Sequence, residues 1–174
     1  STNEVTTIAG QIMRDVYVDG IGTSAKFNRP EGVATDGTSI YVADANNNRI
    51  RKIDIATLYV SLIAGSGMQG SIDGIGTAAR FNTPGSITMA GGNLYVSDTN
   101  NYTIRKIIIS TCEVVTIAGL AGTTGTSDGI GSDARFRSPR GLTVNGENLY
   151  VADSSNSTIR QINLTTFEVT TFAG

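Results

Sequence analysis

Three aspartates, each of which opens an Asp-Gly-Ile-Gly motif, are the residues best suited to binding a ligand. They are Asp19, Asp73 and Asp128, and each begins a glycine-rich stretch. A carboxylate beside exposed backbone carbonyls suits Ca²⁺, which takes about six to eight oxygen ligands. One carboxylate in each loop is too few for a calcium cage, so these aspartates are weak calcium candidates. The pattern favours a turn in which the carboxylate accepts backbone N–H groups.

Two other polar positions and one aromatic position recur along the chain. A second set of three aspartates recurs: Asp44, Asp98 and Asp153. Each of them ends an apolar run before an Asn- or Ser-rich turn, which is typical of side chains that cap backbone amides. The arginines follow seven residues later and are expected to pair with carboxylates or carbonyl groups between blades, while phosphate binding is the weaker interpretation. We interpret all of these as structural repeat positions: Asp44, Asp98, Asp153, Arg51, Arg105, Arg160, Phe27, Phe81 and Phe136.

The composition argues against catalysis by this chain. It contains no histidine and one cysteine, Cys112, so a Ser-His-Asp triad and imidazole metal ligands are excluded. No catalytic residue is assigned, and no cofactor is expected apart from the weak calcium candidates.

The charge pattern argues against nucleic acid and membranes as partners. Thirteen basic and 15 acidic residues give a net charge of −2. Arg135, Arg137 and Arg140 form a local basic cluster, but acidic residues on the same expected face offset it, whereas nucleic acid needs a clearly positive stripe. No apolar run reaches the length of about 18 residues that would indicate a membrane-spanning helix.

The elements that must position these residues belong to a sequence repeat that occurs three times. The stretches 19–53, 73–107 and 128–162 share one sequence pattern, and equivalent residues recur at steps of 54 and 55 residues. A second phrase fills the gaps and occurs four times, ending at Gly10, Gly65, Gly119 and Gly174. A fixed period of this size indicates a solenoid, a propeller or an array.

Each copy predicts four short antiparallel strands. In the middle copy these are residues 85–89, 94–98, 103–108 and 113–118, separated by turns rich in Gly, Asn, Ser and Thr. The inner runs lack a clean alternation of apolar and polar residues, which fits a sheet packed on both faces. The sequence therefore predicts an all-β fold in which each copy is one propeller blade.

The motif order in each copy carries a family resemblance. Ile-Ala-Gly, then DGxGxxAxFxxP, then LYVxDxxNxxIRKI resembles the NHL-repeat family of β-propellers, in the version common in bacterial extracellular proteins and similar to the NHL region of teneurins. The resemblance covers nearly the whole chain. It implies a ring of about six blades and an extracellular or periplasmic location.

The repeat count then raises a problem of closure. We predict an extra fourth strand at residues 1–10 and three blades at residues 11–65, 66–119 and 120–174. Because a closed propeller needs about four to eight blades, three blades are expected to form half of a ring of about six blades or part of a larger array. The extra strand suggests strand exchange with a partner.

Two functional interpretations follow. The leading one is a non-enzymatic binding or assembly module that completes a propeller or filament by sharing strands with another copy or with the rest of a longer chain. Its expected partner is protein, most plausibly another copy of itself. The alternative is a fragment of a propeller enzyme, such as a Ca²⁺-dependent, lactonase-like hydrolase, whose catalytic residues lie in missing blades.

Overall fold

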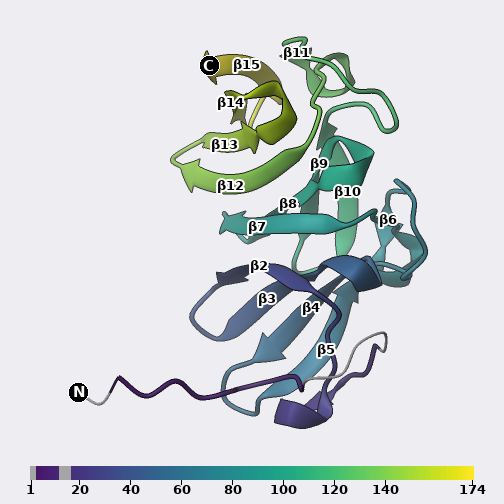
Figure 1. Ribbon diagram of the computed structural model, residues 1–174, viewed down its shortest axis with the longest axis vertical. Helices are drawn as coiled ribbons and strands as arrows, with labels where there is room; N and C mark the ends of the chain where they lie inside the picture. The colour runs from purple at the N-terminus through teal and green to yellow at the C-terminus, as the bar shows by residue number, and fades with distance from the viewer. Residues whose placement is uncertain (1–2, 12–16) are drawn as a thin grey trace.

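Three antiparallel β-sheets follow one another along the long axis of the molecule in the computed structural model (Figure 1). The structure describes residues 3–11 and 17–174. The predicted all-β class is confirmed, and the sheets lie within the three predicted repeats. The N-terminal segment and the end of the chain lie at opposite ends of the stack.

Each sheet is one blade, formed by consecutive strands plus a short strand from the preceding excursion. Blade 1 contains β1 (Gly20–Ile21), β2 (Pro30–Thr35), β3 (Ser39–Asp44), β4 (Arg49–Asp54) and β5 (Tyr59–Ala64). Blade 2 contains β6 (Gly74–Ile75), β7 (Pro84–Ala90), β8 (Asn93–Asp98), β9 (Thr103–Ile108) and β10 (Glu113–Ala118). Blade 3 contains β11 (Gly129–Ile130), β12 (Pro139–Asn145), β13 (Asn148–Asp153), β14 (Thr158–Asn163) and β15 (Glu168–Ala173).

The blades have five strands rather than the predicted four. The sheet order in blade 1 is β1-β5-β4-β3-β2, and the other two blades repeat it. The additional strand is the Gly-Ile pair of the Asp-Gly-Ile-Gly motif, in which Gly20 pairs with Val60 and Ile21 with Tyr59. A strand of two residues is too short to show a period-2 pattern, so no periodic signal predicts it.

Short 3-10 helices complete the repeat. One follows the short outer strand and another connects the second and third strands of the main meander; they are η1 (Gly22–Ser24), η2 (Ala45–Asn47), η3 (Gly76–Ala78), η4 (Thr99–Asn101), η5 (Gly131–Asp133) and η6 (Ser154–Asn156). The second kind ends in a residue with left-handed backbone: Asn48, Tyr102 or Ser157. This conformation lets the chain reverse within three residues.

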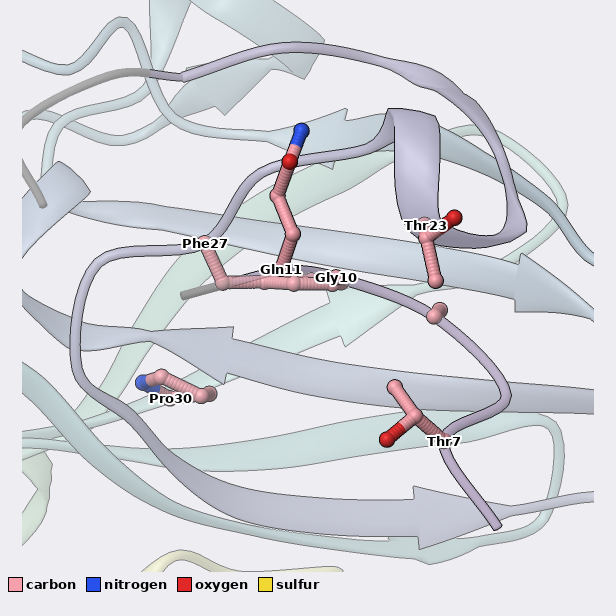
Figure 2. Close-up of a pocket in the computed structure, with 7 residues that line it drawn as sticks. Thr7, Gly10, Gln11, Thr23, Phe27 and Pro30 are labelled. Carbon is pink, nitrogen blue, oxygen red and sulfur yellow. The ribbon is translucent and has the colours of Figure 1, made fainter. Parts of the chain in front are cut away.

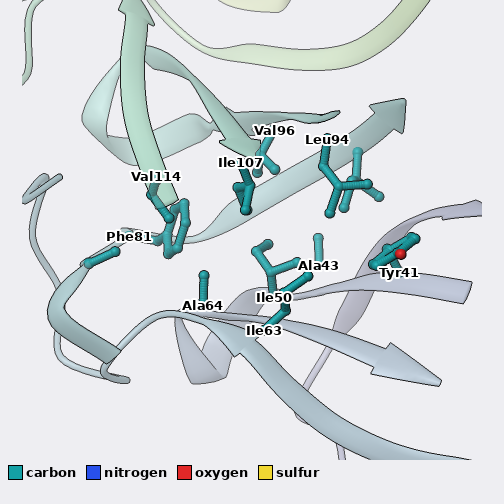
Figure 3. Close-up of a cluster of buried hydrophobic side chains, with 12 residues drawn as sticks. Tyr41, Ala43, Ile50, Ile63, Ala64, Phe81, Leu94, Val96, Ile107 and Val114 are labelled. Atoms are coloured by element: carbon teal, nitrogen blue, oxygen red, sulfur yellow. The ribbon is translucent and has the colours of Figure 1, made fainter. Parts of the chain in front are cut away.

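The hydrophobic core lies between blades. One cluster joins Tyr41, Ile50 and Ile63 of blade 1 to Phe81 and Leu94 of blade 2 (Figure 3). A second cluster repeats this packing between blades 2 and 3. Blade 2 takes part in both clusters and is therefore covered on both faces, which gives the missing alternation in its sequence a physical cause.

The segment before blade 1 behaves differently from the prediction for residues 1–10. Within the described part of the chain, residues 3–10 form no strand, and residues 1–2 lie outside it. Gly10 nevertheless donates a hydrogen bond from its N–H to the Gly22 carbonyl (3.1 Å), as Gly65 does to Gly76 and Gly119 to Gly131 (3.0 Å each). Residues 8–10 thus lie where the end of the fourth main strand of a preceding blade would lie, but among the described residues no third main strand lies beside them.

The innermost strands approach each other closely at Gly32. A Cβ atom at this position would lie 2.6 Å from the Gly85 carbonyl oxygen and 2.7 Å from the Ile87 nitrogen. We expect Gly32→Ala to lower the free energy of unfolding by ~1–3 kcal/mol, because two backbones would have to separate. The matched control is Gly141→Ala, at the same position of blade 3, where the nearest atom to the new Cβ is Ala152 Cβ at 3.6 Å. Urea denaturation at low protein concentration measures both, and equal stabilities would contradict the close approach.

Candidate functional site

A buried arginine at the centre of each blade contacts the recurring aspartates that the sequence analysis identified. In blade 2, Arg105 is fully buried, and its Nη2 lies 2.7 Å from Asp73 Oδ1 while its Nη1 lies 2.8 Å from Asp98 Oδ2. Its Nη atoms also donate to the carbonyls of Arg80 (2.9 Å) and Ile72 (3.0 Å). One guanidinium therefore ties the third strand to the end of the second strand and to the excursion before the blade.

The same cluster recurs in the other two blades, and we call it the arginine clamp. It consists of an arginine, the aspartate of the Asp-Gly-Ile-Gly motif and the aspartate that ends the second strand: Arg51, Asp19 and Asp44 in blade 1, Arg160, Asp128 and Asp153 in blade 3. The flat face of each guanidinium lies about 5 Å from a phenylalanine ring: Arg51 on Phe27, Arg105 on Phe81 and Arg160 on Phe136. All members of a clamp come from one blade and its own excursion, rather than from two blades.

The aspartate that ends the second strand accepts hydrogen bonds from three residues, as blade 2 shows. Asp98 accepts hydrogen bonds from the Asn82 N–H (2.7 Å), Asn101 Nδ2 (2.7 Å) and Arg105 (2.8 Å). Burial raises the pKa of the Asp98 carboxyl to about 6, against the opposing effect of Arg105 and the two hydrogen bonds. The carboxylate is therefore ionised at neutral pH and caps the turn that leads into β7.

The weak calcium candidates are the clamp members nearest to solvent: the Asp73 and Asp128 side chains are about half exposed and that of Asp19 is one-third exposed. Besides its arginine, Asp73 accepts hydrogen bonds from the N–H (3.1 Å) and hydroxyl (2.9 Å) of Thr116. Blade 1 has Leu62 at the position of Thr116, and there the Tyr17 hydroxyl donates to Asp19 instead (2.9 Å). Burial alone would raise the pKa of the Asp128 carboxyl, but hydrogen bonds from Thr171 and Arg160 hold it below the usual value.

These contacts leave the aspartates without the surroundings of a cation site. Over residues 3–11 and 17–174, no group of three or more Asp, Glu, Cys or His side chains is arranged to hold a metal ion. A guanidinium already lies where a cation would have to approach each carboxylate. The clamps can therefore fix loop geometry, but their carboxylate oxygens are already occupied by hydrogen bonds and ion pairs within the blade.

The two ends of the stack expose apolar side chains. We call the outer surface of blade 3 the C-terminal end face and define it by Tyr150, Ala152, Ile159 and Phe172. Phe172 is 61% exposed and lies edge-on to the Tyr150 ring, with a centroid distance of 5.2 Å. Leu142, Tyr150 and Ile159 also line a shallow pocket on this surface.

The other end of the stack presents the complementary half of a blade seam. We define the N-terminal end face by Phe27, Val33 and Ile40. Val33 is 65% exposed, and Phe27 and Ile40 are half-buried. Thr7, Gly10 and Phe27 contribute to a pocket of about 500 Å³ between the N-terminal segment and the excursion of blade 1 (Figure 2).

Sequence reasoning did not single out the apolar residues of the end faces, nor Tyr17 and Thr116 in the clamps. A usable signal existed for the end faces, because Val33, Ile87 and Leu142 occupy the same repeat position, as do Phe172, Ile63 and Ile117. At both positions the residue of blade 2 is buried against a neighbouring blade, as Ile87 (4% exposed) and Ile117 (3% exposed) show.

No helix in the described ranges has the length and apolar character required to span a bilayer.

Comparison with known proteins shows what two segments of the chain resemble. The NHL repeat family matches residues 27–53 and 136–162, in the first and third blades. The human NHL repeat-containing protein 2 is 30% identical over 172 residues, a match that covers 84% of this chain and 24% of that protein. Two segments of the chain thus match the NHL repeat, and the chain spans about a quarter of this relative.

Solved structures place the blades among propeller-type folds. A Bacteroides thetaiotaomicron protein described as being of unknown function superposes with a TM-score of 0.65 and 27% identity, over 83% of this chain and 36% of that one. Virginiamycin B lyase from Staphylococcus aureus superposes with a TM-score of 0.57 and 19% identity, over 83% of this chain and 41% of that one. The second likeness, at this identity, concerns the fold alone.

Proposed function

We propose that this array of NHL repeats is a non-enzymatic assembly module whose two end faces join those of a second copy, head to tail. Two copies supply six blades, which lies within the range of about four to eight blades that close a propeller. The C-terminal end face of each copy then packs against the N-terminal end face of the other. Such a contact is heterologous, and it closes into a ring with two equivalent seams.

The observation that carries this proposal is a difference in exposure between equivalent positions. Val33 is 65% exposed, whereas Ile87, at the same position of blade 2, is 4% exposed. Phe172 is 61% exposed, whereas Ile117 is 3% exposed. Each exposed side chain therefore sits at a position that a neighbouring blade covers elsewhere in the same molecule.

The occupant of each face is argued from the interior seams. At the seam between blades 1 and 2, Tyr41, Ile50 and Ile63 of one blade pack on Phe81 and Ile87 of the next. The C-terminal end face offers the equivalents of the first set, and the N-terminal end face offers those of the second. Burying matched apolar surfaces of this kind is the main driving force for association.

Strand sharing is part of the proposal because the end segments are near duplicates. Residues 4–10 read EVTTIAG and residues 168–174 read EVTTFAG. Gly174 packs on Ser157 and Thr158, as Gly65 packs on Asn48 and Arg49, whereas Gly10 keeps only the contacts to the following excursion. Both segments claim one place at a seam, so the N-terminal segment of one copy is expected to replace or extend β15 of the other.

The compartment proposed for this assembly is extracellular or periplasmic. It follows from the likeness of the repeats to the bacterial extracellular type and to the NHL region of teneurins. Detection of the chain in the culture medium or periplasm of its source cells, rather than in the cytoplasm, tests it.

Light scattering across a concentration series tests the assembly. We expect a mass of twice 18.2 kDa at high concentration and a single chain on dilution. A chain that stays monomeric at millimolar concentration contradicts the proposal.

Replacing one apolar side chain on an end face should prevent association without affecting the fold. Phe172→Asp is expected to raise the dissociation constant by at least about a hundredfold, because the charge would be buried in the seam. The matched control is Ile130→Asp. Ile130 is 60% exposed, and its equivalents Ile21 (62%) and Ile75 (64%) are equally exposed, so this position belongs to no seam. Circular dichroism should show unchanged β-structure for both variants, and equal weakening by both would contradict a role for the end face.

A further inference from the structure

The first residue after the repeated proline differs in charge among the three blades. Glu31, Gly85 and Arg140 occupy this position, in the sequences Pro-Glu-Gly, Pro-Gly-Ser and Pro-Arg-Gly. All three line one hollow of about 190 Å³, where the innermost strands β2, β7 and β12 converge. Glu31 and Arg140 are both exposed there.

The geometry between blades 1 and 2 shows what this position meets in the next blade. A Cβ atom at Gly85 would lie 3.3 Å from Glu31 Oε2. The side chain at this position in one blade therefore reaches the base of the side chain at the same position in the following blade. In blade 2 that following residue is glycine, which offers no side chain to Glu31, and Glu31 instead pairs with Arg29 (2.9 Å), two residues earlier in its own blade.

We infer that Arg140 of one copy and Glu31 of a second copy form an ion pair across each seam of the assembled ring. This inference rests on the proposed function, since it needs blade 3 of one copy to be followed by blade 1 of the other. Taken blade by blade around the ring, the residues at this repeat position are then Glu31, Gly85 and Arg140 of one copy, followed by Glu31, Gly85 and Arg140 of the other. By the geometry of Glu31 and Gly85, Arg140 reaches the base of Glu31 of the second copy.

The arrangement selects a second copy of this chain in the head-to-tail orientation. In a head-to-head contact, Glu31 would meet Glu31, and in a tail-to-tail contact Arg140 would meet Arg140. Like charges side by side are unfavourable, and opposed charges at an interface contribute to orientation and to the rate of encounter more than to affinity. The glycine in blade 2 keeps the interior position from competing for either charge.

Reversal of each charge tests the pair in the intact 174-residue chain. Glu31→Arg alone and Arg140→Glu alone are each expected to raise the dissociation constant about tenfold or more, because each places like charges at both seams. The effect should shrink as salt is added, since the residues are exposed. Controls that reverse a charge away from the hollow are Glu147→Arg and Arg137→Glu, and both should associate like the unaltered chain.

Mixing the two variants is the decisive measurement. In an equimolar mixture, Arg140 of the Glu31→Arg chain faces Glu31 of the Arg140→Glu chain at one seam, and the reversed pair forms at the other. We expect the mixture to recover association to within about threefold of the unaltered chain, as should the double variant E31R/R140E. If the unaltered chain dimerises but neither reversal weakens it, or mixing fails to rescue it, the ion pair is overturned while the assembly stands. If the unaltered chain never dimerises, the proposed function itself fails.

Discussion

Replacing Arg105 by methionine is expected to lower the free energy of unfolding by ~3–5 kcal/mol, the cost typical of removing one partner from a buried ion pair. Arg105 is fully buried and its guanidinium contacts Asp73 (2.7 Å) and Asp98 (2.8 Å). Without it, Asp98 keeps its hydrogen bonds from Asn82 and Asn101 but remains a buried carboxylate with no cation. The carbonyls of Arg80 and Ile72 also lose the hydrogen bonds from Arg105, although the Ile72 carbonyl keeps that from the Arg80 N–H (2.9 Å).

Two variants separate the clamp from a general loss of charge. Lys106→Met removes a positive charge from the next position of β9, where the side chain is half-buried, and should change stability by less than about 1 kcal/mol. The double variant R105M/D98N should be more stable than Arg105→Met alone, because the uncompensated carboxylate is gone. Urea denaturation followed by circular dichroism measures all three. A loss below about 1 kcal/mol for Arg105→Met would show that the clamp does not hold the blade together.

The clamps show which part of the site was predictable from sequence. The period identified every member, because Asp73, Asp98 and Arg105 each recur in all three copies. It did not show that they meet: Asp73 and Arg105 are 32 residues apart, and a repeat places both in each blade without fixing the distance between them. The sequence favours a turn in which Asp73 accepts backbone N–H groups and leaves calcium as a weak alternative; in the structure Asp73 accepts the Thr116 N–H and also forms the exposed half of an ion pair with Arg105.

The strands were predictable for a simpler reason. Runs such as 94–98 and 103–108 combine β-branched and aromatic residues between Gly- and Asn-rich turns, and local chemistry of this kind acts before tertiary packing. The end faces depend instead on position in the array. Val33 and Ile87 are interchangeable in type, and their different exposure comes only from the presence or absence of a blade before them.

The phenylalanine of each excursion provides the second large expected effect. Phe81 and Phe136 are fully buried at interior seams, and Phe81→Ala or Phe136→Ala should each cost ~3–5 kcal/mol. Each ring also lies beneath the clamp arginine of its blade, so the cavity would open next to a buried charge. Urea denaturation of the dilute chain measures the loss.

Phe27 is the matched position without a preceding blade. It lies about 5 Å from Arg51, as its equivalents do from their arginines, but it is only half-buried. In the dilute chain, Phe27→Ala should therefore cost about half as much as Phe81→Ala, since less apolar surface returns to water.

For dimerisation, measured at high protein concentration, Phe27→Ala should have the larger direct effect of the two substitutions. If a second copy supplies the missing blade, Phe27 becomes the equivalent of Phe81, and Phe27→Ala should weaken dimerisation about tenfold or more, whereas Phe81→Ala acts on the fold at an interior seam. Sedimentation equilibrium of Phe27→Ala beside the unaltered chain measures this. Equal stability losses for Phe27→Ala and Phe81→Ala in the dilute chain, together with unchanged dimerisation, would mean that the end position already packs as an interior seam does and needs no partner.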